Sequence, residues 1–332
     1  MKKYTICLCG GGNISHALAG VLSKQGHSIN ILTRKPQLWN RKIITNMNNT
    51  DKKNTFESNL NIISDDPFIA LEDVDIIIVT CPIFAYDDIL NNIKDYLLSN
   101  MTIICVPGRL FINYTQKYNI KNNIITILRT PYICLVEEYG KSVNINGCAH
   151  NGINYWSNFE NAEIILQNLF DFTLYKVENH LSIDLVNSNL LLHSSRLYTL
   201  FHNNKIYDTE PSFYKEWCIE SSLLLIKCDE ELHHLIDKMN ENIDNKIYVK
   251  QILTHYESID EISLTNKINS IRAFTNGRTP VIFKNNKYYP DVKHRFFQEE
   301  IIALKFVLDL STMYNIKIPN IEKMYMSFIA LK

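Results

Sequence analysis

The chain has 332 residues, 46% of them hydrophobic, and its 34 Lys and Arg nearly balance its 35 Asp and Glu, leaving a formal net charge of −1. This length suits two domains with full cores, and the composition excludes a disordered, collagenous or polyanion-binding protein. We expect a soluble, cytoplasmic protein. No basic patch with interleaved aromatics points to a nucleic-acid partner, no apolar stretch is long enough to cross a membrane, and the apolar run in the opening MKKYTICLC is too short for a signal peptide. The eight cysteines show no zinc-ligand spacing, which predicts reduced thiols and no metal site.

The first stretch of the chain predicts a strand, a tight turn, a helix and a second strand within about 30 residues. Residues Tyr4–Cys9 are a short apolar run of strand formers, followed at once by three glycines, 10–12. Apolar residues then recur at helical spacing from Ile14, Gly26 ends that helix, and Ile29–Leu32 is the second strand. This order is typical of the βαβ unit that binds dinucleotides.

Each residue of the glycine turn has a physical task in such a unit. Gly10 permits the tight turn, and Gly12 lets the backbone approach a pyrophosphate. The N–H groups of Asn13 and Ile14, which open the helix, are expected to face that anion. The third glycine of the usual pattern is replaced here by Ser15.

The end of the second strand indicates which dinucleotide is bound. A site for NAD(H) usually places Asp or Glu there, to accept a hydrogen bond from the ribose 2′-hydroxyl. This chain has Thr33, Arg34 and Lys35 instead, with Arg41 nearby. Cations suit a 2′-phosphate, so NADP(H) is preferred over NAD(H), although Arg34 and Lys35 also fit ordinary surface charges.

Strands and helices continue to alternate along the first half of the chain. Strands are predicted at 61–64, 75–80, 102–106, 124–128, 142–147 (as an edge strand) and 173–177, and helices at 36–49, 67–71, 84–98, from 109, and at 161–170. Cys81 and Pro82 follow the apolar run DIIIVT, at the carboxyl end of a central strand where a cofactor is expected. The fold class is therefore α/β, with a Rossmann-type doubly wound parallel sheet over residues 1–178.

The second part, residues 179–332, is predicted to be mainly α-helical. Helical patterns cover 180–201, 211–225, 229–239, 245–255 and 298–314, and strand patterns nearly vanish. A helical domain after a nucleotide-binding domain predicts a dehydrogenase whose second domain supplies residues facing the nicotinamide.

His193 is the first candidate for chemistry. It lies on a predicted helix with Asn189 one turn earlier on the same face. An imidazole in that place can act as a general acid near neutral pH. A hydrogen-bonded structural histidine is the alternative.

The segment RFFQEE is the second candidate. Arg295 is expected just before a helix, with Glu299 and Glu300 in its first turn. A carboxylate here can orient His193 and stabilise its charged form, while Arg295 can bind a substrate carboxylate through two hydrogen bonds. The alternatives are acidic residues that favour the helix dipole and a surface arginine.

Together these segments resemble the octopine/nopaline (opine) dehydrogenases. GGGNISHALAG is similar to the family's GxGNxxxxxA start, Asn189-Leu-Leu-Leu-His193 resembles its Asn-Pro-x-x-His motif, and Arg295–Glu300 resembles its Arg-Tyr-x-x-Glu-Asp. Thr130-Pro-Tyr-Ile-Cys134 is a weaker likeness to Leu-Pro-Tyr-x-Cys-Arg. The chain departs from these patterns at Leu190 and Ser194, where the family has prolines, at Leu135, where it has Arg, and at Glu300, where it has Asp.

The resemblance implies an enzyme that condenses an amino acid, or an amine derived from one, with an α-keto acid such as pyruvate and reduces the imine with NAD(P)H. It implies that His193 protonates the carbonyl oxygen, that Glu300 holds His193, and that Arg295 and Asn189 bind substrate. It implies an NAD(P)-dependent oxidoreductase acting on CH–NH bonds, with small-molecule partners; a homodimer is left open.

Two other functions remain open at this stage. One is a reductase of the ketopantoate reductase or glycerol-3-phosphate dehydrogenase type, for which Lys238 and Asn242 offer a Lys-x-x-x-Asn pattern. The other is a non-enzymatic sensor that binds NADP(H). The joint presence of His193, Arg295 and Glu300 favours the enzyme.

Overall fold

A computed structural model describes residues 2–48, 54–149, 152–274 and 277–331. The chain divides into two compact units, Met1–Asp184 and Leu185–Lys332, whereas the boundary expected from sequence is 178/179. No helix over the described residues combines the length and the hydropathy that crossing a bilayer requires.

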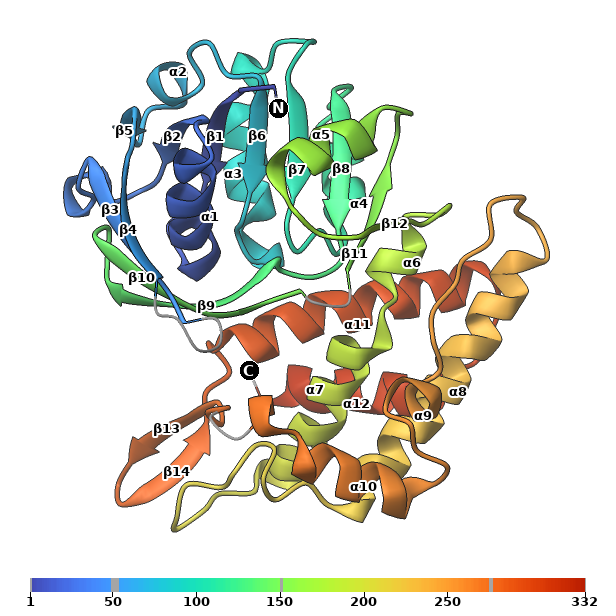
Figure 1. Ribbon diagram of the computed structural model, residues 1–332. Helices are drawn as coiled ribbons and strands as arrows, with labels where there is room; N and C mark the ends of the chain where they lie inside the picture. Colours follow the sequence, from blue (N-terminus) through green and yellow to red (C-terminus); the bar gives the residue numbers. More distant parts are fainter. Residues whose placement is uncertain (1, 49–53, 150–151, 275–276, 332) are drawn as a thin grey trace. The chain divides into compact units, whose positions relative to one another are not determined.

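The first unit is built on an eight-stranded sheet with the order β12-β11-β8-β7-β6-β1-β2-β5 (Figure 1). Its strands are β1 Thr5–Cys9, β2 Ser28–Leu32, β5 Ile62–Ser64, β6 Ile76–Val79, β7 Thr102–Cys105, β8 Asn123–Ile127, β11 Ile153–Ser157 and β12 Leu174–Lys176. Every neighbouring pair from β5 to β8 is parallel, and β11 runs antiparallel against β8. The predicted doubly wound α/β fold is confirmed.

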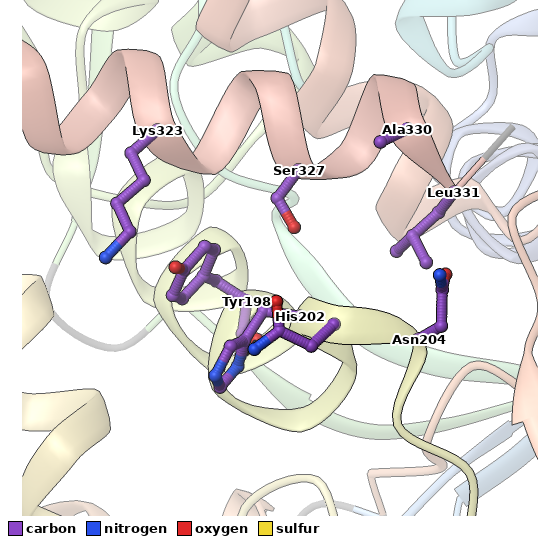
Figure 2. Close-up of a pocket in the computed structure, with 8 residues that line it drawn as sticks. Tyr198, His202, Asn204, Lys323, Ser327, Ala330 and Leu331 are labelled. Atoms are coloured by element: carbon purple, nitrogen blue, oxygen red, sulfur yellow. Dashed lines mark hydrogen bonds between the residues drawn. The ribbon is translucent and has the colours of Figure 1, made fainter.

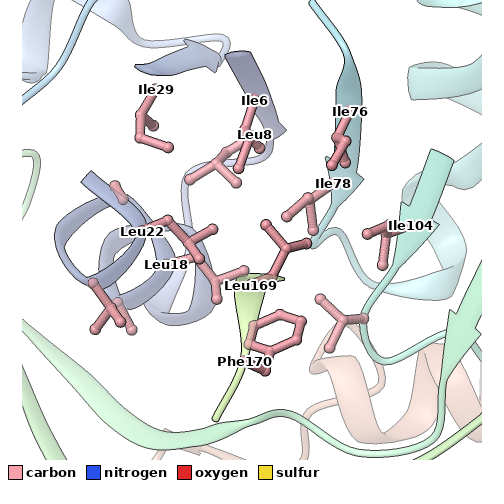
Figure 3. Close-up of a cluster of buried hydrophobic side chains, with 14 of the residues drawn as sticks. Ile6, Leu8, Leu18, Leu22, Ile29, Ile76, Ile78, Ile104, Leu169 and Phe170 are labelled. Atoms are coloured by element: carbon pink, nitrogen blue, oxygen red, sulfur yellow. The ribbon is translucent and has the colours of Figure 1, made fainter. Parts of the chain in front are cut away.

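Both faces of this sheet are covered, which is why its strands read as continuous apolar runs. In β1, Ile6 and Leu8 belong to the main core cluster, while Cys7 and Cys9 point to the other face, and all four are fully buried. Figure 3 shows a part of this core in which side chains from two helical segments pack on the strands: Leu18, Leu22, Leu169 and Phe170 against Ile6, Leu8, Ile76 and Ile78.

The helical segments of this unit match the predictions in most places. They are α1 Asn13–Lys24, η1 Pro36–Leu38, α2 Pro67–Ala70, η2 Ile83–Ala85, α3 Tyr86–Ile93, η3 Lys94–Tyr96, α4 Phe111–Lys117, α5 Ala162–Leu169 and α6 Leu181–Asp184. Tyr86 of α3 packs edge-on against Phe111 of α4, with ring centroids 5.2 Å apart.

A second, four-stranded sheet is a feature that the sequence prediction lacks. Its order is β4-β3-β10-β9, with β3 Lys42–Met47, β4 Asn54–Asn59, β9 Tyr132–Glu138 and β10 Ser142–Cys148. In Figure 1, α1 lies between this sheet and the larger one, and core residues from both sheets pack on it.

The second sheet overturns two sequence predictions. The helix expected at 36–49 is wrong over its described residues, because only η1 is helical and Ile43 and Thr45 are then buried alternately, as in a strand. Residue 49 lies outside the described residues. The strand expected at the edge, 142–147, is interior, because β9 pairs with its other side.

The second unit is mainly helical, as predicted. Its helices are α7 Asn187–Phe201, η4 His202–Asn204, α8 Ile219–Asn240, α9 Ile252–His255, α10 Glu261–Ser270, η5 Arg272–Phe274, α11 Arg295–Met313 and α12 Pro319–Ala330, and a hairpin joins β13 Val281–Lys284 to β14 Lys287–Pro290.

Several helix boundaries differ from the prediction. The helix expected at 180–201 is two helices, and those expected at 211–225 and 229–239 merge into α8. Of 245–255 only the last four residues are helical. The hairpin of β13 and β14 is also absent from the prediction, since its sequences VIFK and KYYP lack the alternation of apolar and polar residues that marks a half-buried strand.

Candidate functional site

The glycine turn at the end of β1 has the geometry that a dinucleotide site requires. Gly10 has a φ of +142°, and a Cβ there would lie 2.5 Å from Oγ1 of Thr80, so only glycine fits. Gly12 precedes α1, and a Cβ on it would meet no atom within 4 Å. The space in front of Gly12 and the N–H groups that open α1 therefore fit a pyrophosphate.

Buried polar side chains hold this turn in place. Oγ of Ser15 lies 2.6 Å from Oγ1 of Thr80, which links α1 to the end of β6. The fully buried His16 donates from Nδ1 to the carbonyl of Gly12 over 2.8 Å and accepts at Nε2 from the N–H of Gly140 over 2.7 Å. Burial lowers the pKa of His16, so the neutral imidazole that this pair of bonds needs is the favoured form.

Asn13 and Ile14, the other two candidates on this turn, stand at the start of α1. The side chain of Asn13 is committed within the protein, because its Oδ1 accepts from the N–H of Val136 on β9 over 2.9 Å. Ile14 is half-buried against the main core cluster. The donors that these two residues offer at the start of α1 are therefore their backbone N–H groups.

The candidates for the ribose side lie at the end of β2. Thr33 is buried and its N–H donates to the carbonyl of Ser64 over 2.9 Å. Arg34, Lys35 and Arg41 are exposed, and none forms an ion pair with a described carboxylate. Three cations without acidic partners are compatible with binding a phosphate.

Cys81 and Pro82 follow β6, and both are partly buried. Sγ of Cys81 lies 3.3 Å from the carbonyl of Cys9, and burial raises the pKa of this thiol to about 12, so it stays protonated at neutral pH. Strands β2 and β6 both pair with β1 in parallel, so the turns after the three strands leave from one edge. The structure thus brings the turn at Gly10, the segment at Thr33 and the segment at Cys81 together.

In the second unit, His193 of α7 is bound at both ring nitrogens. Nδ1 lies 3.1 Å from Oε1 of Glu300 on α11, a carboxylate that is only 1% exposed. Nε2 lies 3.0 Å from the hydroxyl of Tyr214. With Nδ1–H directed to the carboxylate, Nε2 is the nitrogen that can exchange a proton, and its contact in this structure is the Tyr214 hydroxyl.

The start of α11 differs from the sequence prediction. The helix begins at Arg295, and the imidazole of His294 caps it by accepting the N–H of Phe296 over 3.3 Å. Glu299 and Glu300 therefore lie in the second turn rather than the first, and Glu300 is buried against His193 rather than placed for the helix dipole.

The two candidates for substrate binding are both exposed. Arg295 lies with its guanidinium carbon 5.6 Å from the ring centroid of Phe296, the residue that stacks on His193. Asn189 stands one turn before His193 on α7. Both side chains are therefore accessible to a small-molecule ligand.

Tyr214 is a residue that sequence reasoning does not single out. It lies 21 residues after His193, in the segment before α8 that forms no regular helix or strand. The aromatic pair Phe213-Tyr214 reads as ordinary core, and both side chains are indeed buried. Only the folded chain shows that the tyrosine hydroxyl meets the imidazole.

A separate cavity of about 280 Å³ lies between the end of α7 and α12 (Figure 2). Tyr198, His202, Lys323 and Ser327 are among its lining residues, whereas the His193 cluster is not. The rings of Tyr198 and His202 stack 4.8 Å apart, and Nζ of Lys323 lies 5.2 Å from the centroid of Tyr198. This cavity is distinct from the cluster of His193, Tyr214 and Glu300.

Two family models match the chain. Residues 176–330 match the NAD/NADP octopine/nopaline dehydrogenase, alpha-helical domain, and residues 5–118 match the NAD-dependent glycerol-3-phosphate dehydrogenase N-terminus. The first covers the cluster of His193, Tyr214 and Glu300, and the second covers the glycine turn.

Relatives are similar over nearly the whole chain. Tauropine dehydrogenase from Arabella iricolor is 24% identical over 96% of this chain and 89% of its own length. A structure of octopine dehydrogenase with NADH and L-arginine has a TM-score of 0.86 at 20% identity, covering 99% and 89% of the two chains. Yersinopine dehydrogenase with NADP+ bound has a TM-score of 0.74 at 12% identity, covering 99% and 91%. The helical-domain match, together with relatives of this kind over nearly the whole chain, identifies the chain as a member of the opine dehydrogenase family of NAD(P)-dependent oxidoreductases.

Proposed function

We propose that this enzyme uses NADPH to condense an amino acid, or an amine derived from one, with an α-keto acid such as pyruvate, through reduction of an imine. The observation that carries the proposal is the buried carboxylate of Glu300 on Nδ1 of His193, with the exposed guanidinium of Arg295 on the same helix as Glu300. This arrangement offers an imidazole for the carbonyl oxygen of a keto acid and a guanidinium for its carboxylate.

His193 is proposed as the general acid. The carboxylate of Glu300 holds the Nδ1–H tautomer and stabilises the imidazolium, so that Nε2 carries the transferable proton. That proton goes to the keto-acid oxygen, which leaves as water when the imine forms. The aromatic surroundings of His193, which include Phe213 and Phe296, exclude water and protect an imine from hydrolysis.

Arg295 is proposed to bind the carboxylate of a substrate. Its guanidinium is exposed and pairs with no described carboxylate, so its donors are available for a two-bond contact. Asn189, exposed one turn before His193, is proposed to bind a polar group of the same ligand.

For the cofactor, we propose that Gly10, Gly12 and the N–H groups of Asn13 and Ile14 bind the pyrophosphate. The nicotinamide dinucleotide supplies the hydride when bound. Thr33, Arg34, Lys35 and Arg41 are proposed to bind the 2′-phosphate of NADP(H), and Cys81 and Pro82 to line the dinucleotide at the end of β6. Octopine dehydrogenase is solved with NADH and yersinopine dehydrogenase with NADP+, so the preference rests on the local cations.

A matrix of amino acids against α-keto acids, followed by NADPH absorbance, tests this function. We expect turnover with at least one pair, and His193→Ala abolishes it while NADPH binding persists. His234→Ala, an exposed histidine of α8, is the matched control and keeps full activity. No turnover with any pair refutes the proposal.

The rival reductase chemistry depends on Lys238. This lysine lies in the last turn of α8 and pairs with Glu241 over 2.5 Å, as a solvated surface pair does. We therefore expect Lys238→Ala to leave turnover intact. Loss of activity in that variant, with His193→Ala active, supports the rival instead.

A further inference from the structure

Both nitrogens of the His193 imidazole are occupied by protein groups, and this limits how the residue can reach a substrate. Nδ1 bonds Glu300 and Nε2 lies 3.0 Å from the hydroxyl of Tyr214. A substrate oxygen must therefore either displace Tyr214 from Nε2 or receive its proton through Tyr214. The way in which Tyr214 is held distinguishes these two cases.

Tyr214 is packed tightly on several sides. Its side chain is 7% exposed, and its ring stacks on Phe274 with centroids 4.3 Å apart and planes at 18°. A Cβ on Gly277 would lie 2.6 Å from Cδ2 of Tyr214, so there is no room for a side chain between the backbone at Gly277 and the ring. Displacing the hydroxyl requires this packing to open.

Arg196 holds the segment that carries Tyr214. It lies one turn after His193 on α7 and is only 4% exposed. Its Nε donates to the carbonyl of Phe213 and its Nη2 to the carbonyl of Ser212, each over 2.7 Å. Burying a guanidinium costs free energy, and the two hydrogen bonds to Ser212 and Phe213 offset part of that cost. These bonds also fix the position of the segment just before Tyr214.

We propose, on the basis of the function above, that Tyr214 is a proton-relay residue between His193 and the substrate oxygen, and that Arg196 is its positioning residue. In the step that loses water, the Tyr214 hydroxyl gives its proton to the hydroxyl of the carbinolamine formed by the keto acid and the amine. The tyrosine oxygen takes a proton from Nε2–H of the His193 imidazolium. The carbon–oxygen bond breaks, water leaves, and the nitrogen lone pair forms the C=N bond of the iminium, so one proton passes from His193 to water.

The chemistry of the tyrosine agrees with this role. Burial raises the pKa of Tyr214 above its ordinary value, so its hydroxyl is protonated at neutral pH and can act as a donor. When His193 is neutral, the hydroxyl donates to Nε2, and when His193 is charged, Nε2–H donates to the tyrosine oxygen. The same contact therefore serves both states.

Tyr214→Phe tests the relay, because the ring and its stack on Phe274 are kept. We expect kcat to fall at least 100-fold with an active amine and keto-acid pair, with unchanged NADPH affinity, and the proton inventory in mixed H₂O and D₂O to change from curved to linear. Tyr207→Phe is the matched control, since that hydroxyl donates to the carbonyl of Leu200 over 2.8 Å, and it keeps wild-type kcat. A Tyr214→Phe kcat within threefold of wild type overturns the relay.

A second measurement does not depend on turnover. In ¹⁵N spectra, the Nε2 resonance of His193 shifts in Tyr214→Phe and in Arg196→Lys, which keeps the charge but loses the two-pronged contact, and stays unchanged in Tyr207→Phe. If wild type reduces no amine and keto-acid pair, the proposed function fails, yet these spectra still report the Tyr214–His193 contact. An Nε2 resonance that is the same in wild type and Tyr214→Phe refutes the contact itself.

Discussion

Phe296 and Glu300 stand four residues apart on α11 and both contact His193. The imidazole stacks on the Phe296 ring with centroids 4.4 Å apart and planes at 17°, while Oε1 of Glu300 binds Nδ1. Residues at i and i+4 share a face of a helix, so one face of α11 fixes both the plane and the tautomer of the imidazole.

Removing the negative charge of Glu300 is expected to disable the acid without unfolding the site. In Glu300→Gln the side chain keeps its shape but no longer stabilises the imidazolium, so kcat falls by about 10²–10⁴-fold. In Glu300→Asp, which keeps the negative charge, kcat falls less than in Glu300→Gln. Steady-state kinetics check this, and a Glu300→Gln enzyme with wild-type kcat contradicts the assignment.

Arg295 is expected to act on substrate affinity rather than on rate. Arg295→Ala raises the KM for the keto acid about 10–100-fold, because hydrogen bonds to a charged group contribute about 1.5–3 kcal/mol, while kcat changes little. Lys293→Ala, an exposed lysine two residues earlier, serves as control. Equal KM values in the two variants would place the substrate carboxylate elsewhere.

Replacing Arg34 tests the cofactor preference. Arg34→Gln removes a cation from the end of β2, so the KM for NADPH is expected to rise about tenfold or more, whereas the KM for NADH changes less than threefold. Lys42→Ala is the control, because Lys42 is already paired with Glu57 over 2.7 Å. An equal rise for both cofactors means that Arg34 does not bind the 2′-phosphate.

Alanine substitutions at the two outer glycines of the turn are expected to have different effects. Gly10→Ala strains a positive φ and forces a Cβ against Thr80, which lowers the free energy of unfolding by about 1–3 kcal/mol. In Gly12→Ala the added Cβ meets no neighbouring atom, so the fold keeps its stability. The Cβ occupies the space proposed for the pyrophosphate, so NADPH binding weakens at least tenfold. Chemical denaturation and fluorescence titration of NADPH separate the two effects; a destabilised Gly12→Ala protein would contradict the open space.

His16 predicts a pH dependence of stability. The pKa of His16 is lower in the folded protein than in the unfolded chain, so the unfolded chain binds the proton more readily. The stability that the buried, neutral His16 contributes is therefore fully present above about pH 6.5 and is lost as the pH falls through the folded-state pKa. His16→Gln should lower stability at pH 7.5 and make it depend less on pH between 7.5 and 5. Part of the dependence remains, because burial also lowers the pKa of His27. Parallel curves for wild type and variant would show that His16 is not the titrating group.

Local patterns predict the glycine turn and the strands of the larger sheet except β11, for which no strand is expected. Each strand near β1 is a short apolar run with turn residues at its ends, so its type depends on its own neighbours in sequence. The second sheet is not predictable in this way, because β9 and β10 are irregular, with register shifts between Ser142 and Val143 and between Ile145 and Gly147. The pairing of β10 also depends on β3, a strand far away in the sequence.

The sequence by itself determined the two-domain order, the dinucleotide-binding turn and the candidates His193, Arg295 and Glu300, because these are residue types at fixed local spacings. The family resemblance implies that Glu300 holds His193, but the tertiary structure alone decided the geometry, in which Oε1 of Glu300 binds Nδ1 across 107 positions of sequence and Tyr214 meets the opposite nitrogen. Such contacts depend on how α7, α11 and the segment before α8 pack together, and side-chain packing between distant segments leaves no periodic signal in the sequence.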